Sequence, residues 1–242
     1  MERPGMILFD YGHTLVWEKS YDAERGFSAL LEHAVENPLH ADAAMITETY
    51  RRIQRPIVRD VVGLDYEMPA AVYDRAVYDL LGLEFDIPED ECQCVIWDAS
   101  CPMEAMPGIR QLLDRLTAAG IRVGLVSNLA FSEYALRHRI QKTTGFDEWD
   151  LVVASSTYGF RKPSQVLFEI ALRKAGLPAE DILFCGDNTY ADIRGASMAG
   201  MQPVWYNSPI PCFYKPEEHS RKPDVPHVEI SHWDELVKLL KV

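Results

Sequence analysis

The chain has 242 residues, 48% of them hydrophobic, which is enough to bury a large core in one big domain or two modest ones. Its formal net charge is −13 at pH 7, and an acidic surface of this kind repels nucleic acid and anionic lipid. We therefore expect no nucleic-acid partner and no membrane partner.

The sequence also carries no segment that resembles a signal peptide and no apolar run near the ~20 residues of a membrane span. The cytoplasm is the expected location. The five cysteines form an odd count without C-x-x-C spacing, which favours reduced thiols over a disulfide framework or a metal site.

The first predicted strand covers residues 6–10, an apolar run that ends in Asp10. No further strand is predicted until residue 121. Four helical patterns separated by Gly and Pro follow instead, at residues 21–37, 41–62, 69–83 and 88–98. This predicts an all-helical cap domain at residues 17–99, inserted into a core domain made of residues 1–16 and 100–242.

Strands and helices alternate after the insertion. Helices are predicted at residues 107–119 and 163–175, each with Pro near its start and Gly just past its end. Apolar strands are predicted at residues 121–127, 151–155, 182–187 and 201–205. A proline-rich loop at 207–226 precedes a final strand at 227–230 and a helix at 232–240. The alternation predicts an α/β fold with a Rossmann-like parallel sheet covered on both faces.

Polar side chains follow four of these strands. Asp10 ends the first, Ser127 the second, Lys162 follows the third, and Asp187 ends the fourth, with Asp192 five positions later. A single Asp after a strand is usually a cap or a turn residue. However, the carboxyl ends of parallel strands meet at one edge of the sheet, where ligands bind. Three acids, a hydroxyl and a lysine at this edge indicate a reaction centre.

These residues stand in four motifs that together resemble the haloacid dehalogenase superfamily. The motifs are FDYGHTL (residues 9–15), VSN (126–128), RKP (161–163) and GDNTYADIRGASMAG (186–200). The resemblance covers the whole chain, because the helical insertion also matches the position of that superfamily's type 1 cap.

The resemblance implies a Mg²⁺-dependent hydrolase acting on a small phosphorylated molecule. Asp10 would be the nucleophile, and Asp187 and the Gly12 carbonyl would join Asp10 in binding Mg²⁺. Ser127, Asn128 and Lys162 would hold the phosphoryl oxygens. Asp192 would orient the lysine, and Thr14 would brace the first loop and lie among the substrate-binding residues.

Position 12 departs from the family pattern. Phosphatases of the superfamily usually carry a second Asp there, which protonates the leaving oxygen, whereas this chain has Gly12 followed by His13. Losing a general acid typically costs about 10²–10⁴ in rate. His13 is one candidate replacement, because imidazole titrates near neutral pH. The alternative is that His13 only shapes the turn.

Three other functions stay open at this stage. Dehalogenases lack the same acid, but their fourth motif generally lacks the metal-binding GD pair found here at residues 186–187. Phosphonatases need a lysine inside the cap, and residues 20–99 contain none. A regulatory protein that binds phosphate with little turnover is the third alternative. Phosphoryl chemistry is the first choice among these.

The cap has one basic feature, a set of arginines at helical spacing: Arg51, Arg52, Arg55 and Arg59. They could hold a second anionic group of the substrate, or they could form a solvated face paired with nearby acids. The substrate itself is left undetermined, and so is the oligomeric state, with a homodimer as one option.

Overall fold

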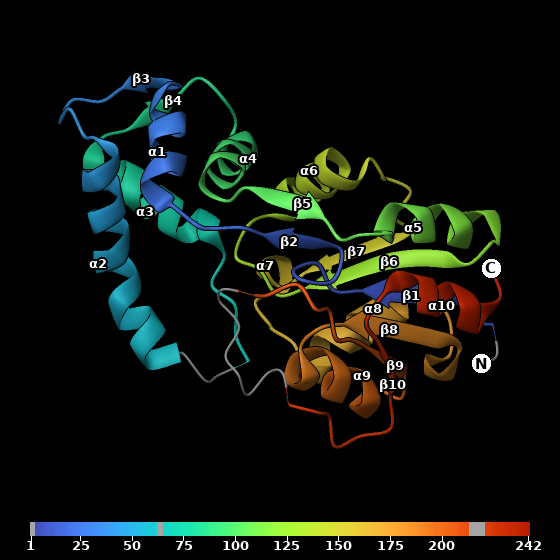
Figure 1. Cartoon of the computed structure of the whole chain (residues 1–242). Helices are drawn as coiled ribbons and strands as arrows, with labels where there is room; N and C mark the ends of the chain where they lie inside the picture. The colour runs from blue at the N-terminus through green and yellow to red at the C-terminus, as the bar shows by residue number, and fades with distance from the viewer. Residues whose placement is uncertain (1–2, 62–64, 213–220) are drawn as a thin grey trace.

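The computed structural model describes residues 3–61, 65–212 and 221–242, without the side chains of residues 56–61. Its centre is a six-stranded sheet with the order β10-β9-β8-β1-β6-β7, in which all neighbours are parallel (Figure 1). The strands are β1 (Met6–Phe9), β6 (Arg122–Ser127), β7 (Leu151–Ala154), β8 (Ile182–Gly186), β9 (Gln202–Tyr206) and β10 (Val228–Ile230). Each lies within about one residue of its prediction, so the α/β fold class is confirmed.

Both faces of this sheet are buried, as the continuous apolar runs predict. In β1, Ile7 and Phe9 join one hydrophobic cluster, and Met6 and Leu8 join the other. The first cluster is completed by α5 (Ile109–Ala118), α6 (Glu133–Thr144) and α10 (Trp233–Leu240). The second is completed by α8 (Gln165–Ala175) and the short α9 (Gly195–Met198). Helices therefore cover the sheet on both sides (Figure 1).

The insertion between β1 and β6 is built mainly from α1 (Ala23–Leu31), α2 (Ala43–Val61), α3 (Ala70–Leu81) and α4 (Glu89–Ser100). These helices have a hydrophobic cluster of their own, with Phe27, Leu30, Ile46 and Val77 among its members. The prediction that the insertion contains only helices was wrong, because it also contains a two-stranded sheet. The first helix ends at Leu31, and β3 (Ala34–Glu36) pairs antiparallel with β4 (Glu84–Phe85). Pro38 disfavours helical backbone just before it, but the pairing with a segment 50 residues away is not visible in a local pattern.

Two short strands that the sequence did not predict join the insertion to the core. They are β2 (Val16–Glu18) and β5 (Met103–Ala105), which pair antiparallel, with Val16 opposite Ala105 and Glu18 opposite Met103. Both crossings between core and insertion thus lie side by side in one ribbon (Figure 1). The predicted boundaries after residues 16 and 99 fall in β2 and in the last turn of α4, and the division into two domains stays a prediction.

Three further short elements lie close to the strand ends, namely α7 (Ser155–Tyr158), a 3-10 helix (Ala179–Asp181) and a π-helix (Thr189–Arg194). The predicted loop at 207–226 has no helix or strand within its described residues, 207–212 and 221–226. None of the described helices is both long and apolar enough to cross a bilayer. Cys92, Cys94, Cys101 and Cys185 are buried, and no disulfide joins any of the cysteines in the described residues.

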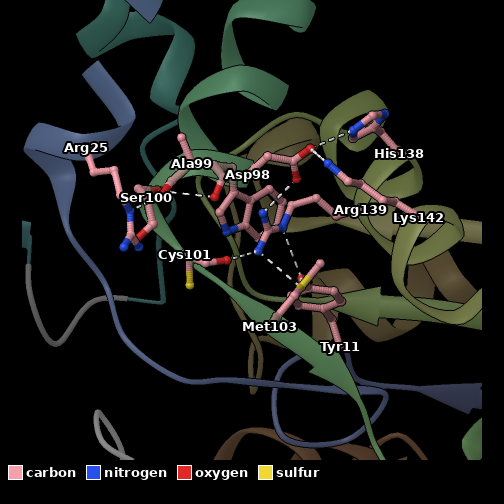
Figure 2. A network of polar contacts seen from close by, with 11 residues as sticks. Tyr11, Arg25, Asp98, Ala99, Ser100, Cys101, Met103, His138, Arg139 and Lys142 are labelled. Carbon is pink, nitrogen blue, oxygen red and sulfur yellow. Dashed lines mark hydrogen bonds and ion pairs between the residues drawn. The ribbon is translucent and has the colours of Figure 1, made fainter. Parts of the chain in front are cut away.

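A buried arginine fastens the insertion to the core. Arg139 of α6 has a side chain only 1% exposed and donates to Asp98 of α4 over 2.9 Å and to the Cys101 carbonyl over 2.8 Å. Its guanidinium also lies 4.5 Å from the centre of the Trp97 ring. Figure 2 shows this guanidinium enclosed by Asp98, Cys101, Met103 and Tyr11, which come from both parts of the chain. The last helix of the insertion is therefore held on the core by a desolvated charge network.

We expect Arg139→Met to lower the free energy of unfolding by about 2–4 kcal/mol, because it leaves the Asp98 carboxylate with only the more exposed Lys142 and His138 as partners. Urea unfolding measures the loss. Arg137→Ala is the matched control, since Arg137 is an exposed residue on the same helix paired with Glu133, and it should cost under about 1 kcal/mol. Equal losses for the two variants would contradict the anchoring role of Arg139.

A second buried acid lies inside the insertion. Asp74 of α3 is 3% exposed and accepts a 3.2 Å hydrogen bond from Gln93 of α4, whose side-chain oxygen in turn accepts from the Ser132 amide of the core over 2.7 Å. Burial raises the pKa of Asp74 to about 7, and the hydrogen bond from Gln93 only partly opposes this. The folded state therefore favours the protonated carboxyl.

The raised pKa of Asp74 makes the stability of the protein depend on pH. The group contributes its full stability below its unfolded pKa near 3.8 and loses it as pH rises through about 7. Asp74→Asn cannot ionise, so the variant should gain stability relative to the wild type by a few kcal/mol between pH 5 and pH 8. Chemical unfolding at several pH values measures this difference. Asp79→Asn, an exposed change on the same helix, is the matched control and should change the stability by less than about 0.5 kcal/mol.

Candidate active site

The predicted site residues meet at the carboxyl edge of the sheet. Asp10 follows β1, Ser127 ends β6 and Asp187 follows β8, and β1 lies between β6 and β8 in the sheet. The Ser127 hydroxyl donates to Asp10 Oδ1 over 3.3 Å. All three residues are buried, with 2–9% of their surface exposed. The parallel topology thus brings together side chains separated by up to 177 positions in the chain.

Lys162 is the centre of the polar contacts at this edge. Its ammonium lies 2.7 Å from Asp10 Oδ1 and 2.7 Å from Asp192 Oδ1, and it donates to the Val126 carbonyl over 2.8 Å. Burial alone would lower the pKa of Lys162, but Asp10 and Asp192 outweigh burial and raise it. The lysine is therefore a permanent positive charge beside Asp10.

Asn128 holds the loop that carries the lysine. Its amide nitrogen donates to the Lys162 carbonyl over 2.9 Å, and its amide oxygen accepts from the Lys162 backbone N–H over 2.7 Å. Two hydrogen bonds to one side chain fix both the position and the orientation of this segment. In this structure Asn128 therefore positions the backbone of Lys162.

Asp192 lies on the π-helix, a rare element that often occurs at functional sites. Its Oδ2 accepts from the Asn188 backbone N–H over 2.9 Å, and the side chain packs over Gly186. A Cβ at position 186 would lie 2.5 Å from both Cβ and Cγ of Asp192, so only glycine fits there. Burial raises the pKa of Asp192, the charges of Asp10 and Asp187 raise it further, and Lys162 opposes them.

Three carboxylates are close enough to share a cation. One oxygen each from Asp10, Asp187 and Asp192 lies within 4.8 Å of the others. Both oxygens of Asp192 already have partners, because Oδ1 contacts Lys162 and Oδ2 accepts from Asn188. Asp10 and Asp187 are therefore the candidate carboxylate ligands for a cation, and the Gly12 carbonyl lies in the same cavity. An all-oxygen donor set of this kind fits a hard divalent cation.

A cavity of about 610 Å³ opens from these residues toward the insertion. Its floor is the acidic edge of the sheet, and its walls carry aromatic side chains, namely Tyr11, Tyr21, Trp97 and Phe131. Trp97 and Phe131 stack with ring centres 4.4 Å apart and planes 7° apart. Glu18 and Arg161 also line the cavity. Arg161 belongs to the RKP motif, whereas Glu18 stands in none of the four motifs, so the sequence gave no sign of it.

The two residues after Gly12 do not line this cavity. His13 is 3% exposed, has left-handed backbone with φ 53°, and faces a separate cavity of about 230 Å³ beside Asp187 and the loop that follows β9. Thr14 is fully buried beneath the same turn. The structure therefore places His13 in the turn after β1, with left-handed backbone, and places Thr14 in the interior without access to the cavity, while its bracing role stays a prediction.

The arginine set of the cap lies elsewhere. Arg51 is exposed and 3.9 Å from Glu48, and Arg52 and Arg55 are exposed on the same helix. The side chain of Arg59 lies outside the described residues. None of the three described arginines lines the cavity, which favours the solvated-face interpretation.

Comparison with known proteins agrees with this geometry. The model of one family, described as haloacid dehalogenase-like hydrolase, matches residues 6–200. A ribulose-1,5-bisphosphate 5-phosphatase from Halopiger xanaduensis is 28% identical over 209 residues, which is 83% of this chain and 84% of that protein. An (S)-2-haloacid dehalogenase from Pseudomonas fluorescens is 26% identical over 201 residues, 80% of this chain and 84% of that one. The crystal structure of a 2-haloacid dehalogenase from Pseudomonas syringae pv. Tomato superposes with a TM-score of 0.62 over 100% of this chain and 99% of that chain, at 22% identity.

The close contact at Gly186 gives a testable prediction. Gly186→Ala must displace Asp192 and its ion pair with Lys162, and overpacking of this kind should destabilise the protein by about 1–3 kcal/mol. Gly5→Ala is the control, because its Cβ would meet mainly the flexible end of Leu177, at 3.0 Å. Urea unfolding of both variants checks the prediction. Equal stability of the two would refute the steric role of Gly186.

Proposed function

We propose that this chain, which belongs to the haloacid dehalogenase-like hydrolase family, is a Mg²⁺-dependent phosphatase of small phosphorylated molecules that works through an aspartyl phosphate on Asp10. The single observation that carries the proposal is that the Asp10 carboxylate lies 2.7 Å from the Lys162 ammonium and within 4.8 Å of an Asp187 oxygen. A nucleophilic carboxylate, a fixed cation and an acidic cation site are what phosphoryl transfer to an aspartate requires.

The proposed nucleophile has a defined orientation. Lys162 and Ser127 both contact the Oδ1 atom of Asp10, and the carboxylate lies at the floor of the cavity with 9% of the residue exposed. A phosphoryl group that enters the cavity would meet Asp10 directly. Lys162 and the Ser127 hydroxyl would then donate to the phosphoryl oxygens and stabilise the charge that develops there.

The chain offers Asp10, Asp187 and the Gly12 carbonyl as ligands for Mg²⁺. When bound, this cation offsets the repulsion between the Asp10 carboxylate and the phosphoryl group. The indole N–H of Trp205 donates to the Asp187 carbonyl over 3.1 Å and so holds the backbone of that ligand. Asp192 would keep Lys162 in place and take no part in the covalent chemistry.

The cavity supports a substrate with an apolar part. Its walls present Tyr21, Trp97 and Phe131, and its volume of about 610 Å³ suits a small metabolite. Arg161 lines the cavity but is already paired with Glu67 of the insertion. We therefore favour a monophosphate with an aromatic or aliphatic group over a substrate that carries a second phosphate.

Dehalogenation is the second candidate, favoured by the similarity to (S)-2-haloacid dehalogenase and by the Ser127-Asn128 pair. The cluster of Asp10 and Asp187, which fits a divalent cation, argues against it, because displacement of halide from carbon by a carboxylate needs no metal ion. Phosphonatase chemistry lacks its lysine in residues 20–99. A binding protein without turnover would share the site and differ only in rate.

The proposal predicts the effect of two substitutions. Asp10→Asn should lower phosphatase activity by at least about 10³-fold, because the amide cannot attack phosphorus. Asp187→Asn should raise the Mg²⁺ concentration needed for half-maximal activity. Asp181→Asn, at the opposite end of β8, is the control and should change neither quantity. A screen of phosphorylated metabolites with and without EDTA supplies the assay, with 2-haloacids in parallel.

Other outcomes of this screen would count against the proposal. Turnover of haloacids that EDTA does not affect would favour the dehalogenase. Mg²⁺-dependent binding of inorganic phosphate without turnover of any phosphate ester would favour the binding protein.

A further inference from the structure

We infer that Glu18 is the general acid and base of this site and replaces the carboxylate missing at position 12; the inference rests on the proposed phosphatase function. Gly12 has no side chain to donate a proton, and His13 does not line the main cavity. An alkyl phosphate nevertheless needs a proton on its leaving oxygen. The donor must therefore come from another part of the cavity.

The residues that line the cavity include four carboxylic acids, namely Asp10, Glu18, Asp187 and Asp192. Asp10 is the proposed nucleophile, Asp187 the proposed cation ligand, and Asp192 is bound to Lys162 and Asn188. Glu18 has none of these roles. Among the acids of the described cavity it is the one left to exchange a proton with the substrate.

The β2–β5 ribbon gives Glu18 its position. Glu18 pairs with Met103 across the ribbon, and strand alternation puts it on the same side as the buried Val16. Its carboxylate is hydrogen-bonded to the Trp97 indole and the Cys101 thiol. Trp97, Cys101 and Glu18 thus line the same cavity as Asp10.

In-line displacement fits this arrangement. When Asp10 attacks from the floor of the cavity, the leaving oxygen lies on the opposite side of the phosphorus, toward the insertion. Glu18 lines the same cavity as Asp10 and belongs to the ribbon that leads into the insertion, so we assign it to the side of the leaving oxygen.

The surroundings of Glu18 suit a proton donor. Burial raises the pKa of its carboxyl above the ordinary value, while the hydrogen bonds from Cys101 and Trp97 and the charge of Arg139 oppose the rise. Tyr11 and Tyr21 are the other titratable groups that interact with it. Burial also raises the pKa of Tyr11 well above its ordinary value, and its hydroxyl donates to Met103, so Tyr11 does not compete as an acid. A raised pKa favours the protonated carboxyl, which is the form that a general acid needs.

The reaction has two steps. In the first, an Asp10 oxygen bonds to phosphorus, the bond from phosphorus to the leaving oxygen breaks, and the Glu18 proton moves to that oxygen. In the second, the Glu18 carboxylate takes a proton from water, the water oxygen bonds to phosphorus, and the bond to Asp10 breaks. Phosphate leaves, and Glu18 is protonated again.

Glu18→Gln tests the inference. The amide keeps the size of the side chain and an oxygen that can accept from Trp97, but it cannot transfer a proton. We expect kcat/KM for an alkyl phosphate to fall by about 10²–10³-fold, and kcat/KM for p-nitrophenyl phosphate, whose leaving group needs no proton, to fall by under about 10-fold. The decrease of wild-type kcat/KM as pH rises through the Glu18 pKa should disappear. One equivalent of p-nitrophenol should appear in a burst, because hydrolysis of the aspartyl phosphate has lost its base.

Glu104→Gln is the matched control. Glu104 lies on the same ribbon, opposite Trp17, with its carboxylate exposed and paired with Lys19, and it should leave every kinetic quantity unchanged. Gly12→Asp in the Glu18→Gln background should restore part of the alkyl phosphate activity, because it returns an acid to the usual position. Thermal unfolding confirms that each variant is folded.

The two proposals fail in different ways. If Asp10→Asn abolishes turnover but Glu18→Gln lowers alkyl and aryl kcat/KM by equal factors, with the pH profile unchanged, Glu18 is not the acid and the phosphatase mechanism stands. If Asp10→Asn remains active, the proposed function itself is wrong.

Discussion

The ion pairs of the buried Lys162 are the constraint on which the site depends. A lysine with 1% of its side chain exposed can stay charged only because Asp10 and Asp192 lie 2.7 Å away, and both acids tolerate burial because the lysine is there. Two neighbouring residues keep the ion pairs of Lys162 in place. Asn128 fixes the lysine loop, and Gly186 leaves room for Asp192. The Lys162 ammonium, which stabilises this arrangement, would also hold a phosphoryl group against Asp10.

Arg139 at the boundary with the insertion resembles Lys162 at the sheet edge, because both are buried cations that pair with carboxylates. It binds Asp98 and the Cys101 carbonyl and lies against Trp97, so it fixes the end of α4 where two cavity residues stand (Figure 2). A second set of contacts joins the insertion to the segment that carries Lys162. The Glu67 amide donates to the Gly159 carbonyl over 2.9 Å, and the Glu67 carboxylate pairs with Arg161, next to Lys162. The position of the insertion is thereby linked to the loop that carries the lysine.

The sequence predicted the features that repeat or that stand at strand ends. The six core strands, the α/β class and the meeting of Asp10, Ser127, Lys162, Asp187 and Asp192 all follow from apolar runs and their polar ends. The family is confirmed by the match over residues 6–200. Local patterns could not show pairing between distant short segments, so β2, β5, β3 and β4 were missed. They also could not show that His13 turns away from the cavity, because this depends on its left-handed backbone.

The proposed replacement for the missing acid at position 12 could not be found from local sequence patterns either, and its location affects the mechanism. Glu18 looks like an ordinary surface residue in the sequence, because its neighbours Trp97, Cys101 and Arg139 are 79 or more positions away. The usual general acid stands two residues after the nucleophile, in the loop after β1, whereas Glu18 stands on the β2–β5 ribbon. An acid at position 12 would move with the core, whereas Glu18 is hydrogen-bonded to residues at the end of α4. Proton transfer from Glu18 would therefore depend on how the insertion lies over the core, so that substrate enclosure and leaving-group departure would be coupled through one side chain.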